Sequence, residues 1–126
     1  MKAILDTSVL LATDLAAIEG ELAISAASLA ELHFGVLVTS DAATRAERLR
    51  RLSDLQRKFD ALPIDEGVAV SYGQLAAAIA VSGRQPRGRV MDLLIAATAH
   101  AQAARLYTRN ANDLVGIEHL VDIVAL

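Results

Sequence analysis

The sequence contains no cysteine and no tryptophan. A disulfide framework, a catalytic thiol and a zinc site built on thiolates are therefore excluded, and the absence fits a reducing cytoplasm, where we expect the protein. No apolar run reaches the roughly 18 residues that a membrane span needs. The first residues do not resemble a signal peptide, because Asp6 interrupts a short apolar run. We therefore expect no contact with a membrane.

Aromatic side chains and lysine are both scarce. The four aromatic residues are too few for the stacking platform that many RNA-binding sheets use. Nearly all the basic residues are arginine, which suits bidentate contact with phosphate. The formal net charge is nevertheless −3, which argues against capture of nucleic acid by the surface as a whole. Any such binding needs a local basic patch.

The remaining composition is that of a compact domain. Of the 126 residues, 54% are hydrophobic and 21% are charged, so the chain can bury a sizeable core. No repeat, low-complexity tract or linker divides the sequence. We therefore expect one domain that spans residues 1–126.

Short apolar segments alternate with longer segments whose apolar residues recur at helical spacing. This alternation predicts a three-layer α/β/α domain with a mainly parallel central sheet. Strands are expected at Lys2–Leu5, Leu22–Ile24, Ala61–Ile64, Arg105–Thr108 and Val121–Leu126. Helices are expected from Ser25 or Ser28 to Val38, within Asp41–Asp60, at Asp65–Ser82 with Gly83 closing it, and from Asp92 to Ala104.

An arginine-rich loop precedes the last helix. Arg84, Arg87 and Arg89 fall close together, and no acidic residue occurs between Gly67 and Met91. Because the loop leads into Asp92, we expect it to overhang any site there and its guanidinium groups to hold RNA phosphates. A merely solvated loop is the alternative.

Four acids interrupt otherwise apolar segments: Asp6, Glu31, Asp92 and Asp113. Each alone has an ordinary structural explanation as a helix cap or turn residue, and Ser28 with Glu31 fits the capping-box pattern. Together they predict a site for a hard cation such as Mg²⁺ or Mn²⁺, because carboxylates buried near one another need a compensating charge. The three histidines have no metal-binding spacing.

The sequence resembles the PIN domain, and within it the VapC-type ribonuclease toxins of bacterial toxin–antitoxin pairs. Four segments carry the resemblance, and they occur in the family's order. They are Asp6-Thr7-Ser8, Ser25–Gly35 (SAASLAELHFG), Asp92–His100 (DLLIAATAH) and Thr108–Leu114 (TRNANDL). The resemblance covers essentially the whole chain.

The resemblance implies the role of each site residue. It implies that the four acids form a pocket for Mg²⁺ or Mn²⁺, with Asp6, Asp92 and Asp113 as direct ligands. Glu31 is then a ligand or the group that positions the attacking water, and Asn110 competes with Asp113 for the fourth position. Hydrogen bonds that orient the carboxylates are expected from Thr7, Ser8 and Thr108.

The resemblance also implies an activity and partners. The expected protein is a metal-dependent endoribonuclease that hydrolyses RNA phosphodiester bonds, forms a homodimer, and is neutralised by a small antitoxin that places an arginine among the acids. A PIN-like module that binds RNA or protein without cutting, or a housekeeping RNA-processing nuclease, are the alternatives. A haloacid dehalogenase phosphatase is disfavoured because Ser8 stands where it needs an aspartate, and a receiver domain because it needs a late lysine.

Overall fold

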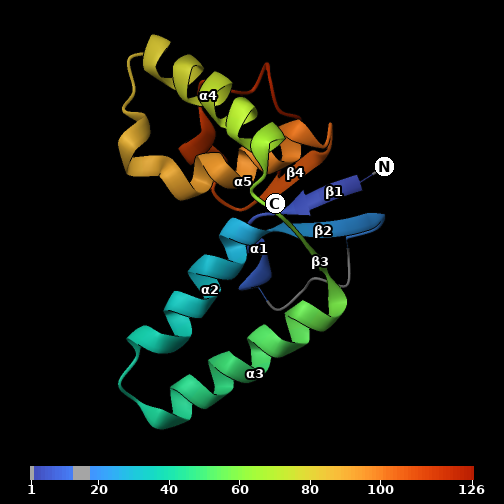
Figure 1. Cartoon of the computed structure of the whole chain (residues 1–126), viewed down its shortest axis with the longest axis vertical. Helices are drawn as coiled ribbons and strands as arrows, with labels where there is room; N and C mark the ends of the chain where they lie inside the picture. Colours follow the sequence, from blue (N-terminus) through green and yellow to red (C-terminus); the bar gives the residue numbers. More distant parts are fainter. Residues whose placement is uncertain (1, 13–17) are drawn as a thin grey trace.

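Five parallel strands form the centre of the computed structural model, which describes residues 2–12 and 18–126 (Figure 1). Their order is β3-β2-β1-β4-β5, and every neighbouring pair is parallel. In chain order the elements are β1 (Lys2–Leu5), α1 (Thr7–Leu10), β2 (Glu21–Ser25), α2 (Ala26–Val38), α3 (Ala42–Lys58), β3 (Asp60–Leu62), α4 (Glu66–Val81), the 3-10 turn η2 (Pro86–Arg89), α5 (Val90–Ala101), β4 (Arg105–Thr108), the 3-10 turn η3 (Ala111–Leu114) and β5 (Ile123–Ala125).

Both faces of the sheet are buried, because successive side chains of a strand point to opposite faces. In β1, Ile4 belongs to a core cluster shared with α4 and α5, whereas Leu5 belongs to a second cluster with residues of α1 and α3. In β2, Ala23 and Ile24 divide between the clusters in the same way. Continuously apolar strands are typical of a parallel sheet covered on both sides. The predicted three-layer α/β fold is confirmed.

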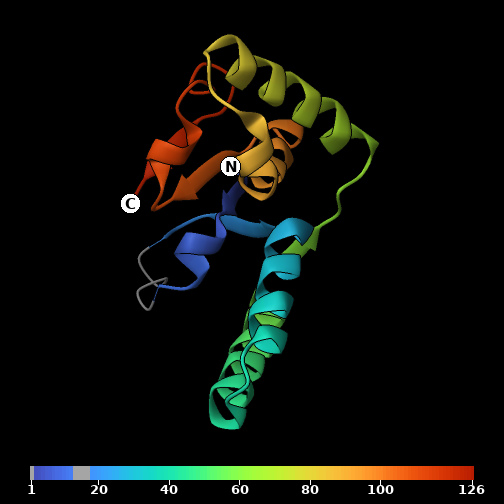
Figure 2. The same cartoon turned by 90° about the vertical axis from the view of Figure 1, so that its left-hand side faces the viewer.

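The helices form two groups. Helices α4 and α5 pack together in one layer, while α2 and α3 form an antiparallel pair that extends away from the sheet (Figures 1 and 2). Within the described ranges, no helix has both the length and the apolarity required to cross a bilayer.

The strand order reverses between β1 and β4. From β1 the chain moves to β2 and β3 on one side, and then crosses to β4 and β5 on the other. In parallel sheets of this kind, ligands bind outside the carboxyl ends of the strands at the point of reversal. Asp6 directly follows β1, and η3 directly follows β4, so both occupy that point.

Local hydrogen bonds correct three details of the sequence-based interpretation. The helix cap is Ser25, whose hydroxyl accepts from the amide of Ala27, so Ser28 lies buried inside α2 and the capping-box interpretation was wrong. Helix α5 begins at Val90 rather than Asp92, because η2 already brings the chain into a helical turn. Strand β3 ends before Pro63, which has no amide hydrogen for the sheet.

We expect Leu75→Ala to lower the free energy of unfolding by about 2 to 5 kcal/mol. Leu75 is fully buried in α4 against the α5 layer, so truncation leaves a cavity under the helix that carries Asp92. Val81→Ala is the matched control on the same helix, because Val81 is 89% exposed. Urea unfolding monitored by circular dichroism measures both changes, and equal losses would contradict the packing described here.

Candidate active site

Asp6 is held more tightly than any other acid of the site. Its backbone amide donates to the carbonyl of Tyr107 at 2.9 Å, which continues the pairing of β1 with β4. Its Oδ2 accepts hydrogen bonds from the hydroxyls of Ser8 at 2.7 Å and Thr108 at 2.8 Å. The residue is only 8% exposed. Two donors therefore fix one carboxylate oxygen and leave the other to face the site.

The same hydroxyls fix the start of the segment after β4. The amide of Arg109 donates to Oγ of Ser8, and the amide of Asn110 donates to Oγ1 of Thr108, each at 3.0 Å. Asp113 then donates its amide to the carbonyl of Asn110 and closes the turn η3. Asn110 and Asp113 are thus carried on a turn whose origin is bonded to the same hydroxyls as Asp6.

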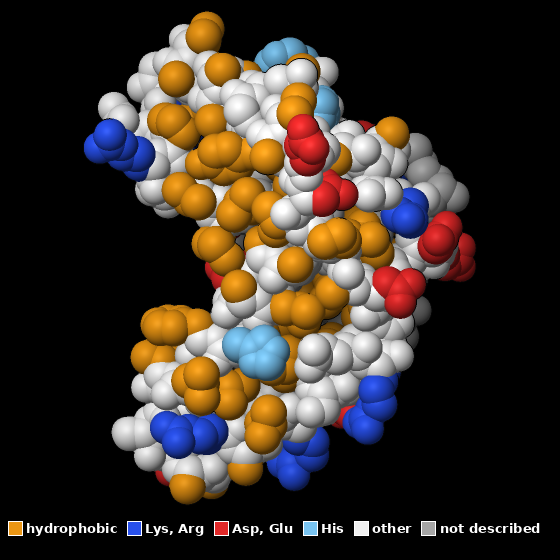
Figure 3. All heavy atoms as spheres, viewed as in Figure 1, with side chains coloured by type: hydrophobic (Ala, Val, Ile, Leu, Met, Phe, Trp, Pro, Cys, Tyr) orange, Lys and Arg blue, Asp and Glu red, His pale blue; other side chains and the backbone are white. Residues whose placement is uncertain are grey.

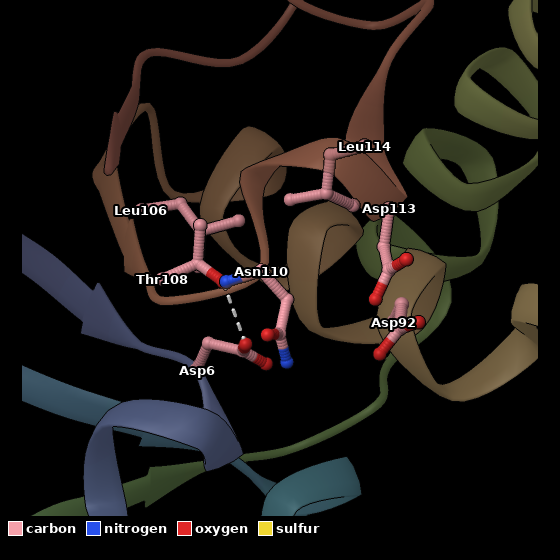
Figure 4. A pocket seen from close by; sticks show the side chains of 7 residues that line it. All are labelled: Asp6, Asp92, Leu106, Thr108, Asn110, Asp113 and Leu114. Carbon is pink, nitrogen blue, oxygen red and sulfur yellow. Dashed lines mark hydrogen bonds between the residues drawn. The ribbon is translucent and has the colours of Figure 1, made fainter. Parts of the chain in front are cut away.

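Asp92 completes a small pocket from the opposite side. It lies in the first turn of α5, and Figure 4 shows its carboxylate beside that of Asp113, with the Asn110 side chain near Asp6. The cavity volume is about 10 Å³, close to the space of one water-sized sphere. Its lining consists of Asp6, Asp92, Leu106, Thr108, Asn110, Asp113 and Leu114.

The surroundings raise the pKa of Asp92 above its ordinary value. Burial is the largest cause, because it disfavours the charged carboxylate, and the negative charges of Asp6, Asp113 and Glu31 follow in that order. The positive charge of Arg89 acts in the opposite direction and does not cancel them. The other three acids predicted from the sequence therefore act electrostatically on Asp92.

Glu31 lies beside this pocket rather than in its lining. It is carried by α2, and its Oε1 accepts a hydrogen bond of 2.7 Å from the Thr7 hydroxyl, which is also bonded to the Ser28 hydroxyl at 2.9 Å. Thr7, Ser8 and Thr108 therefore each donate a hydrogen bond to a carboxylate of the set. Their part in any reaction stays a prediction.

Two of the three loop arginines bond the turn η3. Arg89 donates from Nη1 to the carbonyl of Asp113 at 2.7 Å and pairs with its carboxylate at 3.2 Å. Arg84 donates to the carbonyls of Asn112 and Val115 at 3.3 and 3.2 Å. Arg87 is exposed. The loop thus packs along η3, and two of its guanidinium groups have partners inside the protein.

The donor set fits a hard divalent cation in its chemistry. The polar side chains of the pocket offer only carboxylate, amide and hydroxyl oxygens, the ligands that Mg²⁺ and Mn²⁺ prefer. The mutual repulsion felt by Asp92 is also the cost that a cation offsets. Within residues 2–12 and 18–126, no three Asp, Glu, His or Cys side chains converge closely enough to form a metal site as they lie.

Sequence reasoning missed a second group of residues next to Glu31. A groove between α1, α2 and α3 is lined by Thr7 and Glu31 and also by Arg48 and Arg51. The signal was the three-residue spacing of arginines at the start of α3, which places them on one helix face.

His100, by contrast, bonds the Ser71 hydroxyl at 2.8 Å between α4 and α5, away from the pocket lining.

Sequence comparisons identify proteins that this chain resembles. A family model described as the PIN domain matches residues 3–114. Ribonuclease VapC5 of Mycobacterium tuberculosis is 37% identical over 113 residues, which cover 85% of this chain and 82% of that protein. Ribonuclease VapC8 of the same species is 36% identical over 100 residues, covering 76% and 88%.

Solved structures share the fold. A member of the VapBC family of toxin–antitoxin systems, VapBC-5 from Mycobacterium tuberculosis, superposes with a TM-score of 0.84 at 32% identity and covers 99% of this chain and 97% of that one. VapBC2 from Rickettsia felis, bound to a DNA fragment from its promoter, has a TM-score of 0.80 at 20% identity, with 100% and 99% covered. The second likeness concerns the fold alone.

We expect Asp92→Asn to raise the melting temperature of the protein in EDTA by a few degrees. The raised pKa of Asp92 means that the charged carboxylate destabilises the fold at neutral pH, and the amide removes that charge. The penalty is present above the raised pKa and disappears as the pH falls through it towards 3.8. The gap between variant and wild type should therefore close in acid, and a variant less stable at neutral pH would contradict this account.

Proposed function

Because the chain belongs to the PIN-domain family, we propose that it is a divalent-metal-dependent endoribonuclease and the toxin of a VapBC-type toxin–antitoxin pair. The observation that carries the proposal is the gathering of Asp6, Asp92, Asn110 and Asp113 around one pocket at the reversal of strand order. Relatives named ribonucleases VapC5 and VapC8, at 37% and 36% identity, support the activity. The presence of all four acids favours catalysis over a module that only binds.

In this proposal Asp6, Asp92 and Asp113 hold Mg²⁺ or Mn²⁺, and Asn110 competes with Asp113 for the remaining position. A divalent cation held by carboxylates makes water more acidic and stabilises negative charge on phosphoryl oxygens. The hydroxyls of Ser8 and Thr108 keep Asp6 from rotating, so that its second oxygen faces the pocket.

Glu31 has a separate role in the proposed reaction. Thr7 occupies one of its carboxylate oxygens, and the other accepts a proton or a hydrogen bond from the water that attacks phosphorus. Because water is the attacking group, no nucleophilic side chain is required. As the water oxygen bonds to phosphorus, the bond from phosphorus to the leaving sugar oxygen breaks in line with it, and that oxygen takes up a proton from solvent water.

We assign different tasks to the loop arginines. Arg87 is exposed and contacts RNA phosphates, as the sequence predicts for all three. Arg84 and Arg89 keep η3 in place, since they already donate to its carbonyls. Any phosphate contact that they make uses their remaining N–H groups.

An antitoxin and a second copy of the chain are the proposed partners. The molecule is hollowed between α2 and the half that carries α4 and α5, and apolar side chains border the hollow (Figure 3). Near the end of α2, Phe34, Leu37 and Val38 are 59% to 70% exposed. Exposed apolar side chains of this size suit protein contacts. An antitoxin that covers the hollow and directs an arginine at the acids would block the site.

Cleavage of total cellular RNA by the purified protein tests the proposed activity. With Mg²⁺ or Mn²⁺ we expect discrete fragments, which EDTA abolishes and which Asp6→Asn reduces by more than about 100-fold. Asp122→Asn is the matched control, because Asp122 pairs with Arg105 at the opposite end of β4 from the pocket.

The same assay distinguishes the alternatives. Intact RNA together with a folded protein that binds Mn²⁺ would overturn catalysis and favour a binding module. If the protein cleaves RNA but no neighbouring small gene encodes an inhibitor of that cleavage, a housekeeping RNA-processing nuclease is favoured over a toxin.

We expect Arg89→Gln and Arg87→Gln to affect different kinetic quantities. Loss of Arg89 frees the carbonyl and carboxylate of Asp113, and should lower the rate at saturating RNA by about 10-fold or more. Loss of Arg87 should instead raise the RNA concentration needed for half-maximal rate and leave the saturating rate unchanged. Initial rates over a range of RNA concentrations measure both quantities. Identical effects of the two substitutions would refute this division of tasks.

A further inference from the structure

A groove runs beside the acid pocket between α1, α2 and α3. Its cavity volume is about 390 Å³, much larger than that of the acid pocket. The side chains that matter for its chemistry are those of Thr7, Leu11, Glu31, Leu32, Arg48 and Arg51. It therefore combines two cations, one acid and apolar walls in a space large enough for part of a nucleotide chain.

Both arginines of the groove are held by neutral partners. Arg48 donates from Nη1 to the carbonyl of Gly35 at 2.7 Å. Arg51 donates from Nη2 to the carbonyls of Leu10 and Ala12, both at 2.8 Å. Across residues 2–12 and 18–126, neither guanidinium forms an ion pair. Carbonyl groups orient a guanidinium and leave its full charge and further N–H groups for another partner.

Residues adjacent in the chain line the groove and the acid pocket. Asp6 lines the pocket, and the next residue, Thr7, lines the groove and donates to Glu31, which also lines it. A nucleic-acid strand whose reacting phosphodiester bond lies at Asp6 therefore has the groove beside it. The chain has a net negative charge, so RNA needs local cations near the acids.

We propose that this groove is an RNA subsite, in which Arg48 and Arg51 bind a phosphate next to the one that is cleaved. Leu11 and Leu32 supply apolar contact for the sugar or base of the same nucleotide. The inference rests on the proposed nuclease function and adds to it a second anchoring point, formed by residues other than the loop arginines. Arginine suits this task because its planar fork matches phosphate oxygens.

Helix α3 offers a control that separates phosphate binding from a structural role. Arg45 lies one turn before Arg48 and makes the same kind of contact, from Nη2 to the carbonyl of Thr39 at 2.7 Å. Arg45 does not line the groove. If these arginines serve only to fasten α3 to α2, substitution of Arg45 and of Arg48 should have the same effect.

The test measures RNA binding in an Asp6→Asn background, in which the proposed cleavage is suppressed. A short fluorescent oligouridylate is titrated with protein at several salt concentrations, with Mn²⁺ present. For single strands, each lost phosphate contact reduces the slope of log K against log salt by about 0.7. We expect that reduction for Arg48→Gln, a retained slope for Arg48→Lys, and no change for Arg45→Gln. Circular dichroism shows whether each variant is folded.

Each outcome decides the inference. An unchanged slope for folded Arg48→Gln, an equal reduction for Arg45→Gln, or absence of measurable RNA binding by the Asp6→Asn protein would overturn the subsite. Cleavage of cellular RNA by the wild-type chain is measured separately. If the wild-type chain cleaves RNA while Arg48→Gln keeps the full salt slope, the subsite is refuted and the proposed nuclease function still stands.

Discussion

One oxygen of Asp6, bonded by two hydroxyl groups, connects the parts on which the site depends. Ser8 comes from α1, just after β1, and Thr108 from the end of β4, so the cluster joins the two strands at the reversal of sheet order. The same hydroxyls accept hydrogen bonds from the amides of Arg109 and Asn110, which immediately precede η3. The position of Asn110 and Asp113 relative to Asp6 is therefore set by short polar bonds as well as by the sheet. Such hydrogen bonds to a carboxylate are shorter and stronger than neutral ones.

The clustering of carboxylates around Asp92 destabilises the folded chain. A feature that costs stability in this way indicates a functional site. Selection for stability alone would separate or replace the carboxylates that raise the pKa of Asp92. Arg89 offsets part of the repulsion through its bond with Asp113, yet it leaves Asp6 and Asp92 without a cationic partner in the described part of the chain. A set of acids around one pocket, with partial compensation of their charge, is suited to a ligand that carries positive charge.

Much of the fold and site could be predicted from the sequence, because the decisive residues follow short apolar strands. Strands at Lys2–Leu5 and Arg105–Thr108 have the bounds that their composition indicates, and the acids after them lie at the sheet edge as expected. Glu31 was ambiguous because a capping residue and a site residue have the same local pattern, and only the contact with Thr7, 24 positions away, distinguishes them. The partners of Arg48 and Arg51 on α1 and α2 were likewise beyond sequence reasoning, since helix spacing defines a face but not what that face contacts.

The bond between Thr108 and Asp6 joins residues 102 positions apart in the chain. Strand β1 can therefore pair with β4 only after the residues between them have been synthesised. Long-range parallel pairing of this kind forms slowly, because a large loop must close before the contacts between the strands stabilise the fold. A chain that terminates before Thr108 lacks Thr108, Asn110 and Asp113 of the pocket lining. The topology thus delays the assembly of the pocket until β4 and η3 have been synthesised, so a chain without them cannot form the complete site.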